Sequence, residues 1–293
     1  MRYKPFTFLG SNNIPSGCIS ASGGQEITVG NFKYHIFSGS GTFTVHSNPC
    51  SDSIFALAVG RGGNGGTTGA TRHGAGAGGG VTTSSFAPIT GSYNMSIDVS
   101  GSFGNGDSIA FSGSGNQIIA ERGGNGATST TAAQNGGGGN IPFPTGSVNV
   151  YGFRGTDFNE GGLNQLGAGA GAGGDGDPRS GDSTVGGIGV YVAEFAPLDG
   201  QFFQIYYGGY PAGFYGGGGG GNAPAATPVQ IGEAVEGGGG RNFFPGAYKV
   251  GIQRALNGVP FTGGGGVGGN TPVGFNGNGS GGSGAIYIRY QAP

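Results

Sequence analysis

The residues of this chain that could take part in chemistry are few and widely separated. One candidate is Gly60-x-Gly62-x-x-Gly65, which follows an apolar run and has the glycine spacing of a dinucleotide-binding loop. In such loops the third glycine opens a helix whose N-terminus holds the pyrophosphate. Here residues 66–74 (GTTGATRHG) cannot sustain a helix, and no acidic residue lies about 20 positions further on to bind the ribose. The spacing therefore predicts no nucleotide cofactor, and we expect no cofactor of any kind.

A second candidate is the acidic group Asp175, Asp177 and Asp182, whose carboxylates could bind calcium. The spacing does not match an EF-hand loop, because no glutamate stands at the twelfth position. The favoured interpretation is a solvated acidic loop partly paired with Arg179.

The histidines and cysteines also form no recognisable site. His35, His46 and His73 lie far from one another in the sequence and far from Cys18 and Cys50. Two cysteines are too few for a disulfide scaffold, and two unpaired thiols are favoured over one bridge. The chain also lacks a nucleophile-elbow motif. We therefore predict no metal site and no enzymatic activity.

The better candidates for binding are aromatic side chains in segments flanked by glycine, namely 141–158, 195–215 and 241–248. Tyrosine and phenylalanine on rigid loops offer a large contact area at a low entropy cost, and tyrosine can also donate a hydrogen bond. An alternative stays open for 202–207, which alternate as in a strand and could form a small core or an oligomer interface. The predicted receptor-binding residues are Tyr206, Tyr207, Tyr210, Phe214, Tyr215, Tyr151, Phe153 and Arg154.

Glycine dominates the elements that must position these side chains, with 76 of 293 residues. Glycine has the most backbone freedom to lose, so such a chain is either disordered or depends on missing side chains. A hydrophobic content of 34% and a net charge of −2 argue against disorder. The sparse basic residues argue against nucleic-acid binding, and no run approaches the about 20 apolar residues of a membrane-spanning helix. The chain is therefore expected to bind no nucleic acid and to insert into no membrane.

Short apolar runs bounded by glycine predict an all-β or irregular fold. Residues 1–24 are expected to form an N-terminal arm that could serve as an attachment segment. Residues 25–60 predict a β-meander with strands at 25–29, 32–37, 42–46 and 54–59, including a hairpin over 32–46. Residues 61–293 predict a glycine-rich domain of short strands, among them 190–195, and packed polyglycine-II helices with aromatic loops, closed by a strand at 285–290.

The glycine tracts can be ordered if they pack as extended helices. Polyproline-II geometry has three residues per turn and no internal hydrogen bonds, so its N–H and C=O groups need partners on neighbouring chains. The unit Arg61-Gly-Gly-Asn-Gly65 recurs as Arg122-Gly-Gly-Asn-Gly126 after a second apolar run. Because one unit cannot bury its own face, the repeat predicts that the units stack.

Three features carry a family resemblance: the sequence FKYHIFSGSGTFTV at 32–45, the glycine-rich repeats, and the closing GGSGAIYIRY at 281–290. Together they resemble the glycine-rich domain proteins of tailed bacteriophages. The alternation of tracts and loops is also similar to the distal tail-fibre adhesins of T-even-like phages. In those adhesins, layered polyglycine-II helices carry variable loops that bind the host receptor.

This resemblance implies a virion protein, made in the host cytoplasm, at a tail fibre or fibre tip. Its implied partners are other virion proteins and a bacterial surface protein or polysaccharide. Assembly as a homo-oligomer, for example a trimer, stays open. The alternative is a purely structural role, as a head fibre, decoration protein or fibre spacer with its aromatic residues buried between subunits.

Overall fold

The structure is a computed structural model that describes residues 17–66, 75–97, 109–113, 116–126, 147–151, 169–175, 186–198, 213–219, 257–266 and 279–293. The regular secondary structure of these residues is almost all β-strand, and every strand pair among them is antiparallel, which confirms the predicted all-β class. Within the same ranges, no helix has the length and apolar character needed to cross a membrane.

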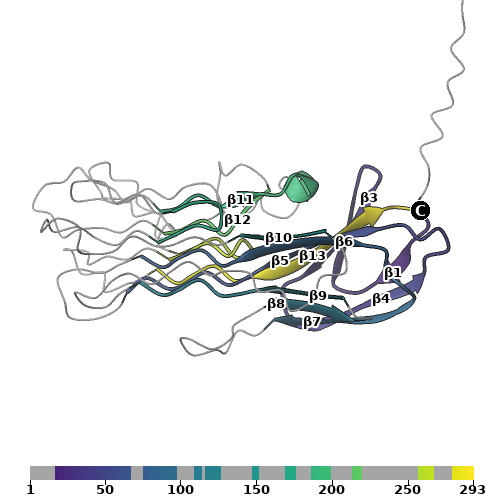
Figure 1. The fold of residues 1–293 in the computed structure, drawn as a ribbon, viewed down its shortest axis with the longest axis horizontal. Helices are drawn as coiled ribbons and strands as arrows, with labels where there is room; N and C mark the ends of the chain where they lie inside the picture. The colour runs from purple at the N-terminus through teal and green to yellow at the C-terminus, as the bar shows by residue number, and fades with distance from the viewer. Residues whose placement is uncertain are drawn as a thin grey trace, which may run out of the picture.

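Two large sheets lie face to face and form a β-sandwich at one end of the molecule (Figure 1). The five-stranded sheet has the order β1 (Ser20–Ser22), β4 (Gly41–Ser47), β7 (Gly91–Ile97), β8 (Ile109–Gly113) and β9 (Asn116–Ala120). The six-stranded sheet has the order β10 (Ser147–Tyr151), β6 (Val81–Phe86), β5 (Ile54–Val59), β13 (Ala285–Gln291), β3 (Phe32–Phe37) and β2 (Gln25–Val29).

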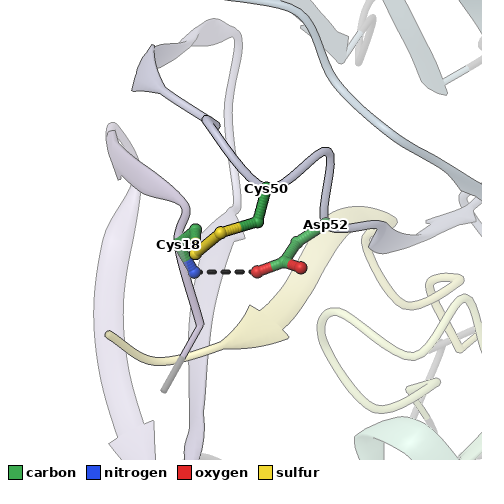
Figure 2. A group of neighbouring side chains, drawn as sticks. All are labelled: Cys18, Cys50 and Asp52. Carbon is green, nitrogen blue, oxygen red and sulfur yellow. Dashed lines mark hydrogen bonds between the residues drawn. A yellow bond between two sulfur atoms is a disulfide. The ribbon is translucent and has the colours of Figure 1, made fainter. Parts of the chain in front are cut away.

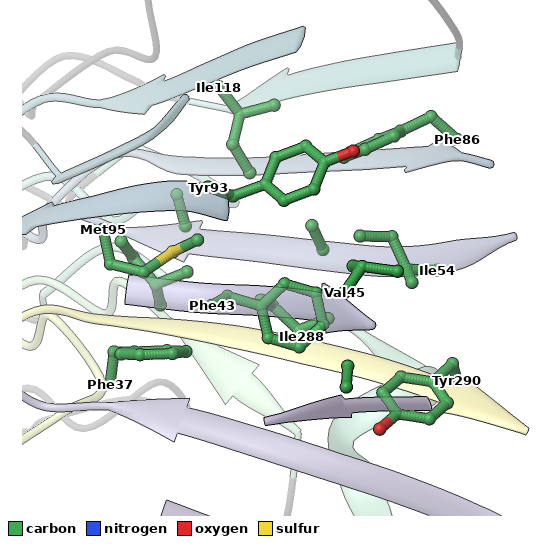
Figure 3. Close-up of a cluster of buried hydrophobic side chains, with 14 of the residues drawn as sticks. Phe37, Phe43, Val45, Ile54, Phe86, Tyr93, Met95, Ile118, Ile288 and Tyr290 are labelled. Atoms are coloured by element: carbon green, nitrogen blue, oxygen red, sulfur yellow. The ribbon is translucent and has the colours of Figure 1, made fainter. Parts of the chain in front are cut away.

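Alternation along the strands fills the space between these sheets (Figure 3). On β5, Ile54, Ala56 and Ala58 point into this space, and on β13 Ile288 does the same. Aromatic and sulfur-containing side chains from both sheets complete the core, among them Phe37, Phe43, Phe86, Tyr93, Met95 and Tyr290.

A third layer covers the other face of the six-stranded sheet. It consists of a two-stranded sheet, β11 (Val190–Tyr191) and β12 (Phe214–Tyr215), and the 3-10 helix η1 (Ala193–Leu198). The Tyr287 ring lies 5.6 Å from the Phe195 ring and 5.4 Å from the Tyr215 ring, centroid to centroid. Strand β5 and residues 285–288 of β13 thus have neighbours on both faces, which explains why these sequences are continuously apolar rather than alternating.

The predicted strands at 25–29, 32–37, 42–46, 54–59 and 285–290 are all present, but the predicted meander is wrong. Strands β3 and β4 do not form a hairpin, because they belong to different sheets. The connection between them crosses the sandwich, and the Ser40 hydroxyl holds it to the backbone of Ile97 at the end of β7. Strand β13, from the far end of the chain, takes the place between β3 and β5.

Two further predictions need correction. Residues 190–195 form only the short strand β11 before η1 begins, and η1 contains Pro197, which has no N–H to donate to a sheet. Residues 1–24 are not wholly an arm, because Ser20–Ser22 form strand β1 and Ile19 is buried in the sandwich.

Cys18 and Cys50 form a disulfide, so the prediction of two unpaired thiols is wrong (Figure 2). Strand β1 pairs with β4 so that Ser20 lies opposite Ser47. Cys18, two residues before β1, is therefore brought near Cys50, three residues after β4, and their Cα atoms are 5.8 Å apart. This pairing between distant strands could not be inferred from the cysteine spacing.

Several strands continue directly into glycine tracts, which run side by side away from the sandwich (Figure 1). The sheet register is preserved across the transition. Val59 lies opposite Val81 in the sheet, and Gly60 and Gly63 then donate to the carbonyls of Gly80 and Ala77. The tract after β5 is therefore aligned by the strand pairing that precedes it.

Candidate functional site

The described glycine tracts form one hydrogen-bonded unit, which we call the glycine bundle. It comprises residues 60–66, 75–80, 121–126, 169–174, 186–189, 216–219, 263–266 and 279–284. Its end away from the sandwich is called the distal end.

In the tract 75–80, N–H groups that are three residues apart donate to the same neighbouring tract. Gly76 and Gly79 donate to 263–266, Ala77 and Gly80 donate to 121–126, and Gly78 donates to 169–174. The same tract accepts bonds from 60–66 and 216–219. A sheet strand has a period of two, so this spacing indicates a helix with three residues per turn, the periodicity expected of polyglycine II.

The bundle joins layers that the sandwich keeps apart. Side chains hold packed sheets about 10 Å from each other, too far for hydrogen bonds between their backbones. The tract 121–126 follows β9 of the five-stranded sheet, yet Gly123 and Gly126 donate to Arg61 and Asn64, which follow β5 of the six-stranded sheet. The two Arg-Gly-Gly-Asn-Gly units therefore lie side by side, as the repeat predicted.

The glycines are needed mainly for space. A Cβ atom on Gly62, Gly63, Gly76 or Gly79 would overlap a carbonyl oxygen of a neighbouring tract. Positive φ angles among the described tract residues occur only at Gly216 and Gly263. Elsewhere in these tracts the backbone conformation suits any residue, and close approach of the chains is what excludes a side chain.

Asparagine amides complete hydrogen bonds toward the distal end. The Asn64 side-chain oxygen accepts the N–H of Gly281 at 2.9 Å, and the Asn125 oxygen accepts the N–H of Asn64 at 2.8 Å. The Asn257 oxygen accepts the N–H of Ser280 at 2.8 Å. Backbone donors that face no carbonyl are thus satisfied by side chains.

The distal end is also where the chain repeatedly leaves and enters the bundle. Bonds from Gly65 to Gly279, from Gly76 to Gly266 and from Gly219 to Gly76 place these residues together at that end. The sequences 67–74 and 267–278 therefore begin and end there, and 220–256 begins there. The described residues that flank these connecting sequences therefore lie together at the distal end.

The structure describes three of the predicted receptor-binding residues, Tyr151, Phe214 and Tyr215, and places these three at the sandwich. Tyr206, Tyr207, Tyr210, Phe153 and Arg154 lie outside the described residues. The described residues that bracket the first three are Leu198, which packs on the six-stranded sheet, and Gly213, whose carbonyl accepts the N–H of Val192. Both lie near the sandwich rather than at the distal end.

The remaining candidates belong to strands. Tyr151 is the last residue of β10 and lies opposite Val81. Tyr215 is only 1% exposed and packs against Tyr287, so its place among the receptor-contacting residues is corrected: its ring is part of the core over the six-stranded sheet. Its neighbour Phe214 points the other way and is half-buried.

An exposed aromatic pair is the described feature closest to the predicted aromatic surface. Tyr191 lies opposite Phe214 across β11 and β12, with ring centroids 5.0 Å apart and a Tyr191 exposure of 52%. The sequence prediction missed Tyr191. The alternation of Val190, Tyr191 and Val192 was the available signal, because both valines are buried and the tyrosine points outward.

His35 is a fully buried titratable side chain, and it has a structural role inside the sandwich. Its Nδ1 lies 2.7 Å from the Gly23 carbonyl, which can only accept, so Nδ1 carries the hydrogen. Its Nε2 then accepts from the Tyr290 hydroxyl at 2.9 Å. Burial lowers the pKa of His35, and the Gly23 bond and the nearby Glu26 carboxylate oppose that shift. Burial also raises the pKa of Tyr290, so its hydroxyl remains a donor.

One group of side chains has the composition of a metal site. Cys18, Cys50 and Asp52 bring two sulfurs and a carboxylate within 4.8 Å of one another (Figure 2). The sulfurs are bonded to each other, so neither is a thiolate ligand, and the Asp52 carboxylate accepts the N–H of Cys18 at 2.8 Å. This group acts as a cross-link in the oxidised protein.

Compared with protein-family models, curated proteins and solved structures, the chain matches none of them.

Proposed function

We propose that this chain is a virion protein of a tailed bacteriophage, located at a tail fibre or fibre tip, that binds a molecule of the bacterial surface. The observation that carries this proposal is the glycine bundle, in which backbone hydrogen bonds in three directions hold the ends of several connecting sequences on one distal face. The sequence resemblance to glycine-rich phage proteins supports the same assignment.

In this proposal the bundle supplies rigidity and the connecting sequences supply recognition. Holding the ends of several loops in place lowers the conformational entropy that binding must remove. Several loops on one face can also contact a repetitive surface at once, which raises the overall strength of attachment. The sandwich, at the opposite end of the bundle, is the part suited to join other virion proteins.

Loop replacement tests this assignment. One variant carries glycine-serine sequences of equal length in place of 67–74 and 267–278, and a matched control changes only the Gly30–Asn31 turn at the sandwich. Each purified protein competes with phage particles for adsorption to a panel of bacterial strains, and gold-labelled antibodies locate the chain on the particles. We expect the control to compete and the loop variant to lose competition. Equal competition by both proteins, or absence of label on the particles, would refute the proposal.

The exposed pair Tyr191 and Phe214 favours a second candidate, a structural virion protein in which a neighbouring subunit covers these rings. Chemical labelling of tyrosine separates the two functions. Tyr191 should be modified equally in the free chain and in the intact particle if the chain is an adhesin. It should be protected in the particle if the pair lies between subunits.

A further inference from the structure

Residues 17–19 lie at a junction between three parts of the sandwich. The N–H of Gly17 donates to the carbonyl of Ala292, just after β13, at 2.8 Å. A Cβ on Gly17 would overlap the carbonyl oxygen of Gln291, so the two chains are in close contact. Ile19 is buried in the core between the sheets. Everything N-terminal to Gly17 is therefore connected to the sandwich through this junction.

Non-covalent contacts hold the following strand only weakly. Strand β1 has three residues, pairs with β4 alone at the edge of its sheet, and changes register between Ser20 and Ala21. Beyond that pairing, the Ser22 hydroxyl contacts His46 Nε2 at 2.9 Å in an exposed position. Opening so short an edge strand exposes the buried side chains of Ile19 and Ala21 but leaves the rest of the sandwich in place, so it costs less than unfolding the sandwich.

The loop that carries Cys50 is held in place without the disulfide. Asn48 accepts the N–H of Asp52 at 2.9 Å and donates to the carbonyls of Asp52 and Pro88 at 2.9 and 3.0 Å. Asp52 in turn accepts the N–H of Cys18 at 2.8 Å. The loop joins β4 of one sheet to β5 of the other, and Cys50 is exposed at its tip. These bonds place the two sulfurs together before any covalent bond forms.

We propose that Cys18–Cys50 is a redox-operated latch on the N-terminal entry to the sandwich, closing onto an already folded protein. With both thiols reduced, residues 17–22 open and close without a covalent restraint. A low-molecular-weight disulfide closes the latch in two exchange steps. The Cys50 thiolate attacks it, forms a mixed disulfide and releases one thiol; the Cys18 thiolate then attacks the Cys50 sulfur and releases the second. The protein loses two protons and two electrons, and both electrons go to the small disulfide. The latch does not depend on what the chain binds.

Hydrogen exchange measured by mass spectrometry tests the latch. The full chain is purified with reductant, and peptides covering 17–22, β5 and β13 are followed before and after addition of oxidised glutathione. The double variant C18S/C50S serves as the permanently open control. We expect oxidation to slow exchange in 17–22 at least tenfold in the natural chain and not in the variant, while β5 and β13 exchange equally slowly in every sample.

Three results would overturn the proposal. Equal exchange of 17–22 before and after oxidation would show that the bond restrains nothing. Rapid exchange of β5 and β13 in the reduced protein or in the double variant would make the disulfide a requirement for folding instead of a latch. A mixed disulfide with glutathione that persists would show that the two sulfurs do not meet in the folded protein.

Discussion

Gly79 is the position at which the close packing of the bundle can be tested most directly. Its N–H donates to the carbonyl of Gly263 at 2.8 Å, and an added Cβ would overlap the carbonyl oxygen of Gly60. Two residues earlier, Ala77 carries a methyl group that is fully buried in the same tract. The tract therefore accepts a methyl group in one direction and excludes it in another, and G79A adds one in the excluded direction.

The expected cost follows from what must move. The tracts on either side of Gly79 have to separate, and forcing one extra methyl group into a packed interior costs about 1–3 kcal/mol. The movement also strains the bond from Gly60 to Gly80 and the bond from Gly79 to Gly263, each worth about 1 kcal/mol. We expect a loss of roughly 2–4 kcal/mol in the free energy of unfolding, which lowers Tm by about 5–15 °C in a chain of this size.

The assay is thermal and urea unfolding followed by tyrosine fluorescence and near-ultraviolet circular dichroism. The matched control is G39A, because Gly39 lies in an exposed turn where an added Cβ meets nothing within 4 Å. We expect G39A to change stability by no more than about 0.5 kcal/mol. If G79A and G39A unfold at the same temperature and urea concentration, the tracts are not in close contact and the argument for the bundle fails.

Two further predictions concern single polar groups. The pKa of His35 is lowered by burial, whereas the unfolded chain keeps a value of about 6.5, so the unfolded state binds the proton more readily. Stability should therefore be fully present above that pH and decline as the pH falls toward the folded-state pKa; H35Q should flatten this decline in urea midpoints measured between pH 5 and 8. N64A should remove the acceptor of the Gly281 N–H, cost about 1–3 kcal/mol and speed exchange of that amide, whereas N64D, which keeps an acceptor oxygen, should keep the slower exchange.

Local sequence patterns predicted the strands well and their partners poorly. Alternation and flanking glycine located 25–29, 32–37, 54–59 and 285–290, because these signals depend only on which side chains must be buried. Pairing is decided by distant residues. Strand β13 separates β3 from β5, and the disulfide depends on the register of β1 against β4. Strand β6 was missed because its serine- and threonine-rich sequence carries a weak apolar signal, although Thr82 and Thr83 are buried. Strand β10 lies within the segment 141–158, which was interpreted from its aromatic residues alone.

The aromatic residues proposed for the candidate site are described by the structure only at Tyr151, Phe214 and Tyr215. Aromatic content identified the region around 214, yet neighbouring rings on a strand point to opposite faces, so Tyr215 enters the core while Phe214 does not. The exposed partner of Phe214 is Tyr191, which lies in the apolar run 190–195 that predicted a strand and was not proposed for binding. Composition shows that aromatic groups are present, but the side on which each one lies follows from the strand pairing.

The backbone hydrogen-bonding pattern repeats every two residues in the strands and every three residues in the glycine tracts. This change makes the bundle possible. In the sandwich the backbone of each described strand pairs with its neighbours in the same sheet, and burial of side chains holds the layers together. In the tracts N–H groups point in three directions, so Gly76, Ala77 and Gly78 reach three different tracts in one turn. Hydrogen bonds then replace side-chain packing between layers, which offsets the large entropy cost of ordering glycine.

With this arrangement, the stability of the bundle depends little on the sequences that connect its tracts. Gly65 and Gly76 already bond to neighbouring tracts on either side of 67–74, and Gly266 and Gly279 accept such bonds on either side of 267–278. The tract ends are therefore held by other tracts, whatever residues connect them. A scaffold of this kind can exchange its distal sequences without losing its own structure, which is what a binding protein needs if the surface it recognises changes.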